Sequence, residues 1–225
     1  MMHTNHRLIA SASLAALAAL LSLGATAPLP SSGPPTPPPP AADPAKVADK
    51  MALVKASWDE VNSALSALPA KLSAAFTASV QEEQLKDAKS DEKGGSDWRC
   101  ETALRTAIDE SKAARKEAGA LADRAANKWK AAKSTSSGCP ADQLPWGPGP
   151  EDARKVADAI SRASSLFKSV DSAKSSSGPS ALAKIWNKAQ EYASKQPKCL
   201  PETKAESIIP QSVPVPCLNT TVRVR

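Results

Sequence analysis

The sequence predicts an all-α fold: an elongated antiparallel bundle of three to four helices with coiled-coil-like seams, stapled by disulfides. Apolar residues recur at helical spacing through residues 45–199, and the stretch from Ala45 to Cys139 contains a single proline. No alternating pattern long enough for a β-strand precedes residue 200. We therefore expect a helical domain over residues 45–199, flanked by a proline-rich stalk (28–44) and an extended proline-rich tail (200–225).

The first 27 residues have the features of a secretory signal peptide. Arg7 precedes the apolar stretch LIASASLAALAALLSLGA, and small residues occupy positions 25 and 27. Cleavage after residue 27 would place Pro28 next to the cut, which is disfavoured, so cleavage after residue 24 or 25 is an equal alternative. An uncleaved anchor is the competing interpretation, because the apolar stretch is just long enough to cross a bilayer. Its Ala- and Ser-rich composition favours removal, and therefore no stable membrane span in the mature chain.

Residues 28–44, PLPSSGPPTPPPPAADP, predict a polyproline II stalk. Proline lacks the backbone N–H and has a fixed φ, so this stretch supports neither a helix nor a sheet. Such a segment is a semi-rigid spacer between the signal and the helical domain.

The first helix is expected from Pro44 to about Lys89. Asp43 is a suitable N-cap, and proline suits the first helical position. The apolar positions follow alternating strides of four and three residues, which is a heptad seam: Val47, Met51, Val54, Trp58, Val61, Leu65, Leu68 and Leu72. Pro69 interrupts the segment without changing this register, so we expect one kinked helix or two helices end to end.

The second helix is expected to begin at Asp97, as the N-cap, and to end before Cys139. Small residues predominate on its seam, which allows a partner helix to approach closely: Leu104, Ile108, Ser111, Ala114, Ala118, Leu121, Ala125 and Trp129. About 36 residues at roughly 1.5 Å per residue make a rod about 50 Å long.

Two shorter helices follow the loop SGCPADQLPWGPGP. Pro150 begins the third helix, with acidic residues in its first turn, and the apolar stripe is Val156, Ile160, Ala163, Phe167 and Val170. Pro179 begins the fourth helix, which ends before Pro197 and carries the stripe Leu182, Ile185, Trp186, Ala189 and Tyr192. The prolines beyond it argue against a regular helix in the tail, and SIIPQSVPVP is too rich in proline for a central strand. We expect the tail to run extended over the bundle.

The order of the helices predicts how the cysteines pair. Cys100 and Cys139 lie at opposite ends of the second helix, too far apart for a disulfide, which needs Cα atoms within about 7 Å. In an up-down-up-down bundle the fourth helix ends beside the end of the second, which brings Cys199 to Cys139. The tail is long enough to return Cys217 to Cys100. We predict the disulfides Cys139–Cys199 and Cys100–Cys217. The alternative, Cys100–Cys199 with Cys139–Cys217, requires a different helix order.

Trp98 and Trp146 lie at a helix start and in a loop, each near a cysteine. They either pack against the disulfides and cap the bundle, or act as exposed anchors in a binding surface, because tryptophan is enriched at interaction hot spots. They are therefore the candidate binding residues. Three further tryptophans lie on the apolar stripes and are expected in the core: Trp58, Trp129 and Trp186.

The mature chain lacks the residues of most catalytic sites. Both histidines, His3 and His6, lie in the signal segment. Without them, Ser-His-Asp and Cys-His groups and His-ligated metals are excluded. The adjacent carboxylates on the helices are expected to be solvated, and Gly94-Gly95 is not followed by the Lys-Ser or Lys-Thr of a phosphate loop. We expect a protein that is not an enzyme and has neither cofactor nor metal.

The charge pattern gives no indication of a nucleic-acid partner. The formal net charge of the whole chain is +6, acids lie between the lysines, and aromatic residues are not interleaved with basic ones. Solvated helix faces explain this pattern, so we expect no nucleic acid and a protein partner of unknown identity.

The C-terminal tail carries the sequon Asn219-Thr220-Thr221, which makes Asn219 a candidate glycosylation site. An even number of cysteines in an exported chain favours disulfides. These features together predict an extracellular protein, secreted or at the cell surface.

The signal, the heptad-patterned helices, the cysteines at the ends and the late sequon resemble helical-bundle surface glycoproteins of parasitic protozoa, of the trypanosome type. The resemblance rests on the seam Val47 to Leu72, the stretch CETALRTAIDESKAARKEAGALADRAANKWKAAK, Cys139, Cys199 and Asn219. It includes no diagnostic motif, and no functional residue carries over. Many such proteins end in a lipid-anchor signal, whereas this chain ends NTTVRVR, so we expect any tether to be the N-terminal segment.

The sequence therefore favours a non-enzymatic secreted or cell-surface protein that acts by display or protein binding. One alternative is a small secreted effector or inhibitor that acts on a host protein or membrane. The other is an enzyme that uses carboxylates alone, which needs an acid with a strongly raised pKa in a cleft.

Overall fold

The computed structural model describes residues 43–92, 98–172 and 179–224, which form one compact unit. Its elements are α1 (Pro44–Asp91), α2 (Glu101–Thr135), the 3-10 turn η1 (Ala141–Gln143), α3 (Pro150–Ser172), α4 (Pro179–Ser194), α5 (Ala205–Ile208), β1 (Ser212–Val215) and β2 (Thr220–Arg223). The predicted all-α bundle is confirmed. The predicted signal peptide and all but the last two residues of the predicted stalk lie outside the described residues.

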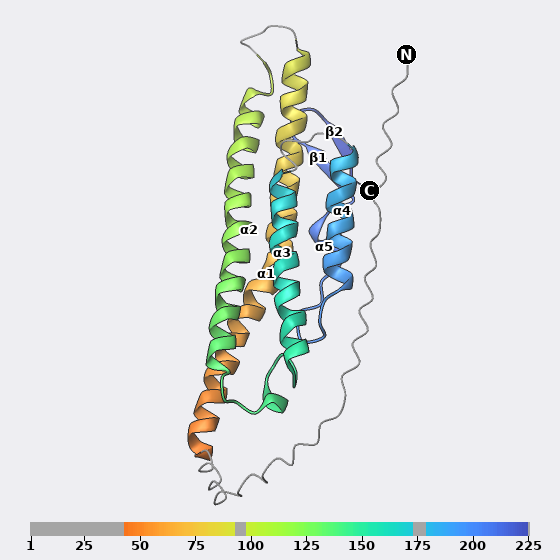
Figure 1. Ribbon diagram of the computed structural model, residues 1–225. Helices are drawn as coiled ribbons and strands as arrows, with labels where there is room; N and C mark the ends of the chain where they lie inside the picture. The colour runs from red at the N-terminus through yellow and green to blue at the C-terminus, as the bar shows by residue number, and fades with distance from the viewer. Residues whose placement is uncertain (1–42, 93–97, 173–178, 225) are drawn as a thin grey trace, which may run out of the picture. The chain divides into compact units, whose positions relative to one another are not determined.

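α1 is one continuous helix of 48 residues that includes Pro69. The Asp43 carboxylate accepts a hydrogen bond from the N–H of Ala45 at 3.1 Å, and Pro44 occupies the first turn, so the predicted start is confirmed. The helix changes direction along its length (Figure 1), as expected for a helix with an internal proline. The seam is buried from Val54 to Leu72, while Val47 and Met51 near the start are half-buried.

α2 returns beside α1 and forms the most extensive helix pair of the bundle (Figure 1). Its buried stripe is mainly alanine and includes Ala107, Ala118, Ala122, Ala125 and Ala132. Five of the eight predicted seam positions are buried, whereas Ile108, Ala114 and Leu121 are half-buried. The predicted cap Asp97 lies outside the described residues. Cys100 occupies the N-cap position and makes no side-chain capping bond. On the exposed flanks, ion pairs join Lys71 to Glu117 at 2.5 Å and Lys128 to Glu60 at 2.6 Å.

α3 packs beside both α1 and α2, and α4 runs back beside α3. The predicted stripe of α3 is buried except Phe167, which is half-buried, while the neighbouring Leu166 is buried in its place. The Phe167 ring lies against Gly119 of α2, where an added Cβ would be 2.9 Å from the ring. The absence of a side chain at Gly119 therefore lets these helices approach.

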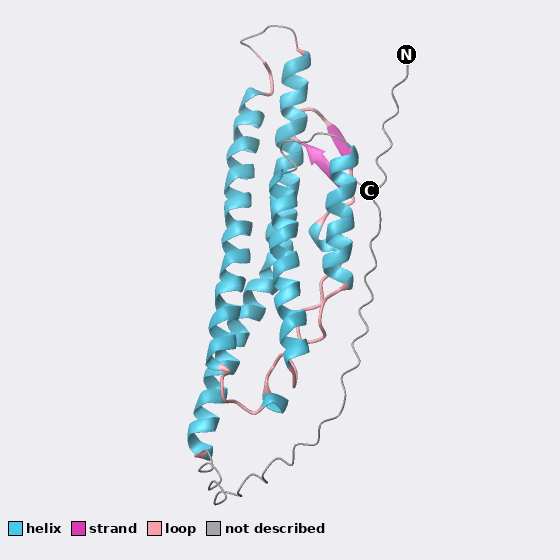
Figure 2. Cartoon of the chain, in the orientation of Figure 1, coloured by secondary structure: helices cyan, strands magenta, loops and turns pink. Residues whose placement is uncertain are grey.

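The tail differs from the extended segment expected from its prolines. It forms the single turn α5 and an antiparallel hairpin of β1 and β2, both packed against α1 (Figure 2). Pro214 faces Thr221 in a pair that exchanges no backbone bonds. Bonded and non-bonded pairs alternate along an antiparallel hairpin, and Gln211–Val224, three pairs away, is a bonded pair through the N–H of Val224 and the carbonyl of Gln211. The backbone nitrogen of Pro214 therefore faces away from β2, so the hairpin loses no hydrogen bond at this position. The Pro214 carbonyl accepts a hydrogen bond from the Gln81 side chain at 2.8 Å. Proline is thus tolerated here at an outer edge.

The core is divided into two apolar clusters. The main cluster occupies most of the bundle and includes Val54 to Val80 of α1 and Ala118 to Ala132 of α2. The smaller cluster, which we call the disulfide-end cluster, comprises Leu85, Trp98, Cys100, Leu104, Ala107 and Val215. Between them, on α1 and α2, lie four buried polar residues, Ser79, Glu82, Ser111 and Arg115, which we call the polar layer.

Candidate functional site

A disulfide joins Cys100 to Cys217, with Cα atoms 5.8 Å apart. It links the start of α2 to the turn of the C-terminal hairpin, across 117 positions of sequence. The tail therefore returns to the end of the bundle where α2 begins, as the helix order predicted.

The second predicted disulfide, Cys139–Cys199, is not formed. Both residues are free thiols, half-buried at the edge of the main cluster. Cys139 lies in the turn that follows α2, whereas Cys199 lies near Asp152 in the first turn of α3. Burial raises the pKa of the Cys199 thiol, and the nearby Asp152 carboxylate acts in the same direction, while a backbone hydrogen bond opposes them. The two cysteines pack as small apolar side chains, a common role for a buried thiol.

Trp98 and Trp146 are both buried, with exposed fractions of 8% and 3%. The interpretation as exposed binding anchors is therefore wrong for both side chains. Trp98 packs in the disulfide-end cluster with Cys100. Trp146 packs edge to face on Trp58 and Trp129, with ring centroids 5.6 Å and 5.1 Å away. We call Trp58, Trp129 and Trp146 the tryptophan cluster.

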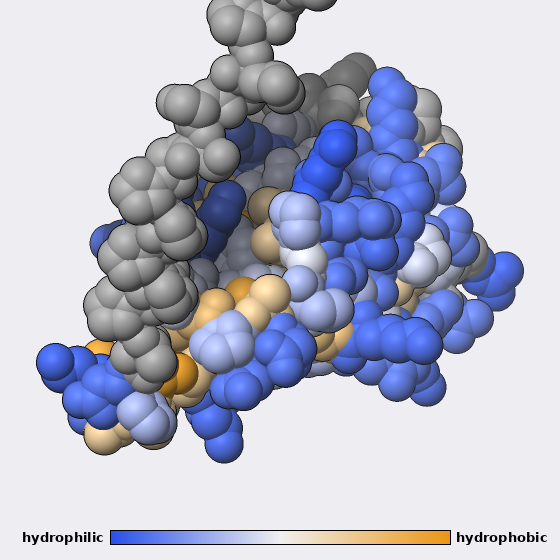
Figure 3. Space-filling model, turned by 60° about the horizontal axis from the view of Figure 1, so that its bottom comes forward, coloured by the Kyte–Doolittle hydropathy of each residue, from blue (hydrophilic) through white to orange (hydrophobic). Residues whose placement is uncertain are grey.

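Few large apolar side chains reach the surface. Figure 3 views the end where α1 begins, and most of the described surface there is hydrophilic, with a limited apolar area. Among the described residues, Leu53 is the large apolar side chain that is exposed, at 60%. A shallow groove of about 330 Å³ lies nearby, lined by Met51, Ala52, Lys55, Trp58, Asp59, Gln143 and Pro145. This apolar area is too small to indicate a docking face by itself.

The sequon lies at the turn of the hairpin. Asn219 and Thr221 are both exposed, and Asn219 has a φ of +50°, a left-handed conformation that asparagine tolerates better than most residues. Cys217 has a φ of +69° in the same turn. The Asn219 side chain is therefore accessible in the folded protein.

The polar layer holds a fully buried carboxylate. Glu82 has an exposed fraction of 0%, and its oxygens lie 2.5 Å from the Lys86 ammonium and 3.7 Å from the Arg115 guanidinium. Arg115 also donates to the Ser111 hydroxyl at 2.8 Å and pairs with Asp171 of α3 at 3.1 Å. Burial of an unpaired carboxylate would cost several kcal/mol, which these two cations offset.

This arrangement fixes the relative positions of three helices, because Arg115 of α2 contacts acids on both α1 and α3. Of the two acids that Arg115 contacts, Glu82 is fully buried and Asp171 is exposed. Among the described residues, no group of three or more His, Cys, Asp or Glu side chains is placed to hold a metal ion. We interpret the polar layer as structural.

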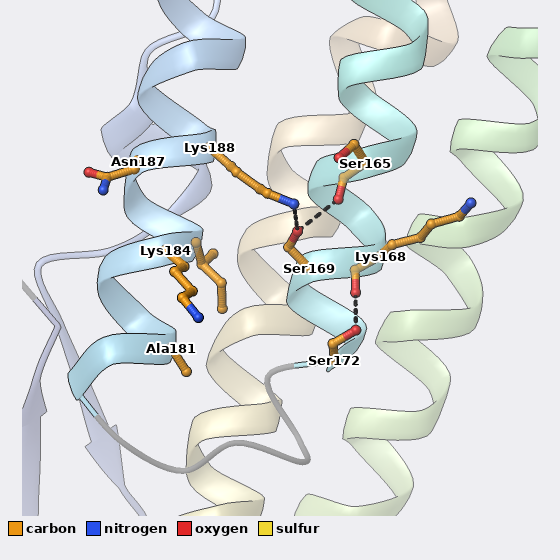
Figure 4. Close-up of a pocket in the computed structure, with 9 residues that line it drawn as sticks. Ser165, Lys168, Ser169, Ser172, Ala181, Lys184, Asn187 and Lys188 are labelled. Atoms are coloured by element: carbon orange, nitrogen blue, oxygen red, sulfur yellow. Dashed lines mark hydrogen bonds between the residues drawn. The ribbon is translucent and has the colours of Figure 1, made fainter. Parts of the chain in front are cut away.

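A surface groove of about 530 Å³ lies between α3 and α4, near the α3 end that Arg115 holds. We call it the α3–α4 groove. Its lining residues are Ser165, Lys168, Ser169, Ser172, Ala181, Lys184, Ile185, Asn187 and Lys188 (Figure 4). Figure 4 shows Lys188 reaching across from α4 to α3, Lys184 lying along the opening, and Lys168 directed away.

The Lys188 ammonium donates to the Ser169 hydroxyl at 2.8 Å. Ser169 in turn donates to the Ser165 carbonyl at 2.9 Å, so its proton is directed away from Lys188. A serine–lysine pair is a nucleophile and base only when the lysine is desolvated. Lys188 is exposed, so the contact positions an ammonium group rather than activating a hydroxyl.

The α3–α4 groove differs from the other grooves in charge. No carboxylate lines it, and no ion pair joins Lys168, Lys184 or Lys188 to an acid of the described residues. Three other grooves on the described surface each include a carboxylate, from Glu110 and Glu117 in one and from Asp59 or Glu60 in the others. The α3–α4 groove is therefore a cationic surface.

In comparisons with known proteins, no family model matches the chain, and no curated protein or solved structure is detectably similar to it. None of the helices formed by the described residues has the length and apolar character needed to span a membrane.

Neither the polar layer nor the α3–α4 groove was predicted from the sequence. The heptad spacing that reaches Leu72 continues through Ala75 to Ser79 and Glu82. A polar residue and a charged residue at these seam positions were therefore a signal for the polar layer. The sequence contains no comparable signal for the α3–α4 groove, because the groove depends on which sides of α3 and α4 face each other.

Proposed function

We propose that this is a non-enzymatic extracellular protein, secreted or held at the cell surface, that acts by display or by binding another protein. The observation that carries the proposal is the Cys100–Cys217 disulfide, which pins the C-terminal hairpin to the far end of the bundle. Disulfides that close long loops persist in oxidising compartments and are rare in the cytosol.

The sequon supports the same location. A glycan on Asn219 would stand on an exposed turn, two residues from Cys217, and would not disturb the core. The signal-like first 27 residues and the resemblance to helical-bundle surface glycoproteins agree with this interpretation.

Because Trp98 and Trp146 are buried, binding would use the polar outer faces of the helices. Display suits a disulfide-stapled bundle behind a proline-rich stalk. The absence of histidine beyond His6 is the sequence feature that favours a role other than catalysis.

The test is the intact mass of the full chain expressed in a eukaryotic secretory system. We expect the secreted protein to lack its signal, to lose mass with peptide N-glycosidase, and to take up two alkyl groups when unfolded without reduction but four after reduction. A matched Thr221→Ala variant should lose the glycan only. Retention of the protein inside the cell with four free thiols would contradict the proposal.

A further inference from the structure

We propose that the α3–α4 groove binds a sulfated polysaccharide chain, with Lys184 and Lys188 as the residues that contact its sulfate groups. The inference rests on the proposed extracellular function, because sulfated polysaccharides are displayed outside cells. It adds to that function a ligand class and a site.

Positive charge is concentrated in the last part of the chain. Residues 43–172 contain twenty Lys and Arg and twenty Asp and Glu, whereas residues 179–225 contain seven basic and three acidic residues. The excess positive charge therefore lies after α3, and α4 contributes Lys184 and Lys188 to it against a single acid, Glu191. α4 forms one wall of the groove.

The groove lysines form no ion pair with a carboxylate of the described residues. The acids closest to them in sequence pair with other cations: Asp171 with Arg115 at 3.1 Å, and Glu191, whose charge also acts on Lys188 from farther away, with Lys195 at 2.8 Å. Elsewhere on the described surface, cations such as Lys71, Lys128 and Lys155 face carboxylates. An anion entering the groove would therefore meet ammonium groups that no carboxylate occupies.

The Lys188 ammonium group is already held in position over the groove. The Ser169 hydroxyl holds the Lys188 ammonium over the groove at 2.8 Å and leaves its other N–H groups to a ligand. Lys184 lies one helical turn away, about 6 Å along α4.

The remaining features select the class of polyanion. Among the described residues, none of the side chains that line the groove is aromatic, so they offer no stacking platform for a single-stranded nucleic acid. Its lining is also without an exposed large apolar side chain that would enter a lipid surface. An open groove with a row of ammonium groups fits an extended chain with repeated sulfates, whose binding is electrostatic.

The experiment measures retention of the secreted, disulfide-intact protein on an immobilised sulfated polysaccharide across a salt series. The test variant is Lys184→Gln with Lys188→Gln. The control is Lys112→Gln with Lys116→Gln, which removes two exposed lysines at the same spacing from α2. All four positions are exposed, so circular dichroism and unfolding should match wild type for both variants.

We expect wild type to be retained near 0.15 M salt, and the Lys184/Lys188 variant to lose roughly tenfold or more in affinity. The slope of log affinity against log salt should fall by about 0.7 for each lost contact, while the control keeps most of the binding. The variant with Lys184→Arg and Lys188→Arg keeps both positive charges and should bind the polymer with an affinity close to that of wild type.

Three results would overturn the proposal: no retention of wild type, equal losses in both Gln variants, or equal binding to the desulfated polymer. Binding to phosphatidylserine vesicles in place of the sulfated polymer would also overturn it. None of these results bears on secretion, the disulfide or the glycan, so the proposed function is tested separately.

Discussion

At one end of the bundle a disulfide joins Cys100 to Cys217, whereas at the other end three tryptophans pack edge to face beside two free cysteines. The segment that is attached to the bundle differs between the two ends. The hairpin at the disulfide end has two four-residue strands and few apolar side chains. The loop at the tryptophan end inserts Trp146 between two long helices.

The difference shows when a crosslink is needed. A buried tryptophan removes about 150–250 Å² from water, enough to hold a loop by packing. The short hairpin of the proline-rich tail buries too little apolar surface to be held by packing alone, and the Cys100–Cys217 disulfide attaches it to the bundle. The polar layer separates the two ends, so each has its own apolar cluster.

The largest expected effect is removal of the crosslink. Cys100→Ser with Cys217→Ser should lower the free energy of unfolding by about 4 kcal/mol, because the closed loop spans 117 positions. Urea unfolding followed by circular dichroism measures this. The matched control, Cys139→Ser with Cys199→Ser, should lose much less, and equal losses would mean that both ends are crosslinked.

At the other end, Trp146→Ala should cost about 3–4 kcal/mol, because it leaves a cavity against Trp58 and Trp129. Trp146→Phe should cost less, since a ring remains. The loss of near-UV circular dichroism reports the change in aromatic packing. Leu53→Ala, at an exposed position of the same end, is the control and should change stability by less than about 0.5 kcal/mol.

Between the ends, Arg115→Met should destabilise by about 2–3 kcal/mol, because Glu82 stays buried with one cation fewer. The control is Lys71→Met, which breaks the exposed pair with Glu117 and should cost less than about 1 kcal/mol. Equal effects in thermal unfolding would show that the polar layer adds nothing beyond a surface ion pair.

A smaller effect is expected from pH. Burial raises the pKa of Tyr192 above its ordinary value of 10.0 and that of Cys199 above 9.0. The unfolded chain therefore releases these protons first, so stability is constant with respect to them below about pH 9 and falls as the pH rises further. Tyr192→Phe should flatten the fall in melting temperature above pH 10. An unchanged slope in that variant would assign the effect to other groups.

The smallest effect concerns the hairpin turn at the disulfide end. Asn219 has a left-handed φ of +50°, so Asn219→Ala should destabilise by about 1 kcal/mol relative to Asn219→Gly. Both variants remove the sequon, so unglycosylated protein is the reference. Equal melting temperatures would mean that the turn does not depend on this conformation.

Repeating local patterns in the sequence predicted the helices well. Asp43 and Pro44 marked the start of α1, and the seam from Val54 to Leu72 is buried as expected. Pro69 did not break α1, because packing along both flanks outweighs one missing hydrogen bond. The helix order also placed Cys217 beside Cys100.

Other predictions were wrong where tertiary contacts outweighed local composition. Prolines 214 and 216 argued against a central strand and for an extended tail; instead a two-stranded hairpin forms, with Pro214 at an outer edge where no N–H is required. Exposure of Trp98 and Trp146 could not be judged from neighbouring residues, since each is covered by elements far away in sequence. Cys139 and Cys199 are both at the tryptophan end, but they pack without bonding.

The sequence by itself determined the helices, the N-cap of α1 and the alternating order of the helices, because hydrophobic periodicity and proline act over a few residues. Only the tertiary structure decided which helix sides meet. That choice created the polar layer, the buried tryptophans and the cationic α3–α4 groove, since each requires side chains from two or three elements to converge in space.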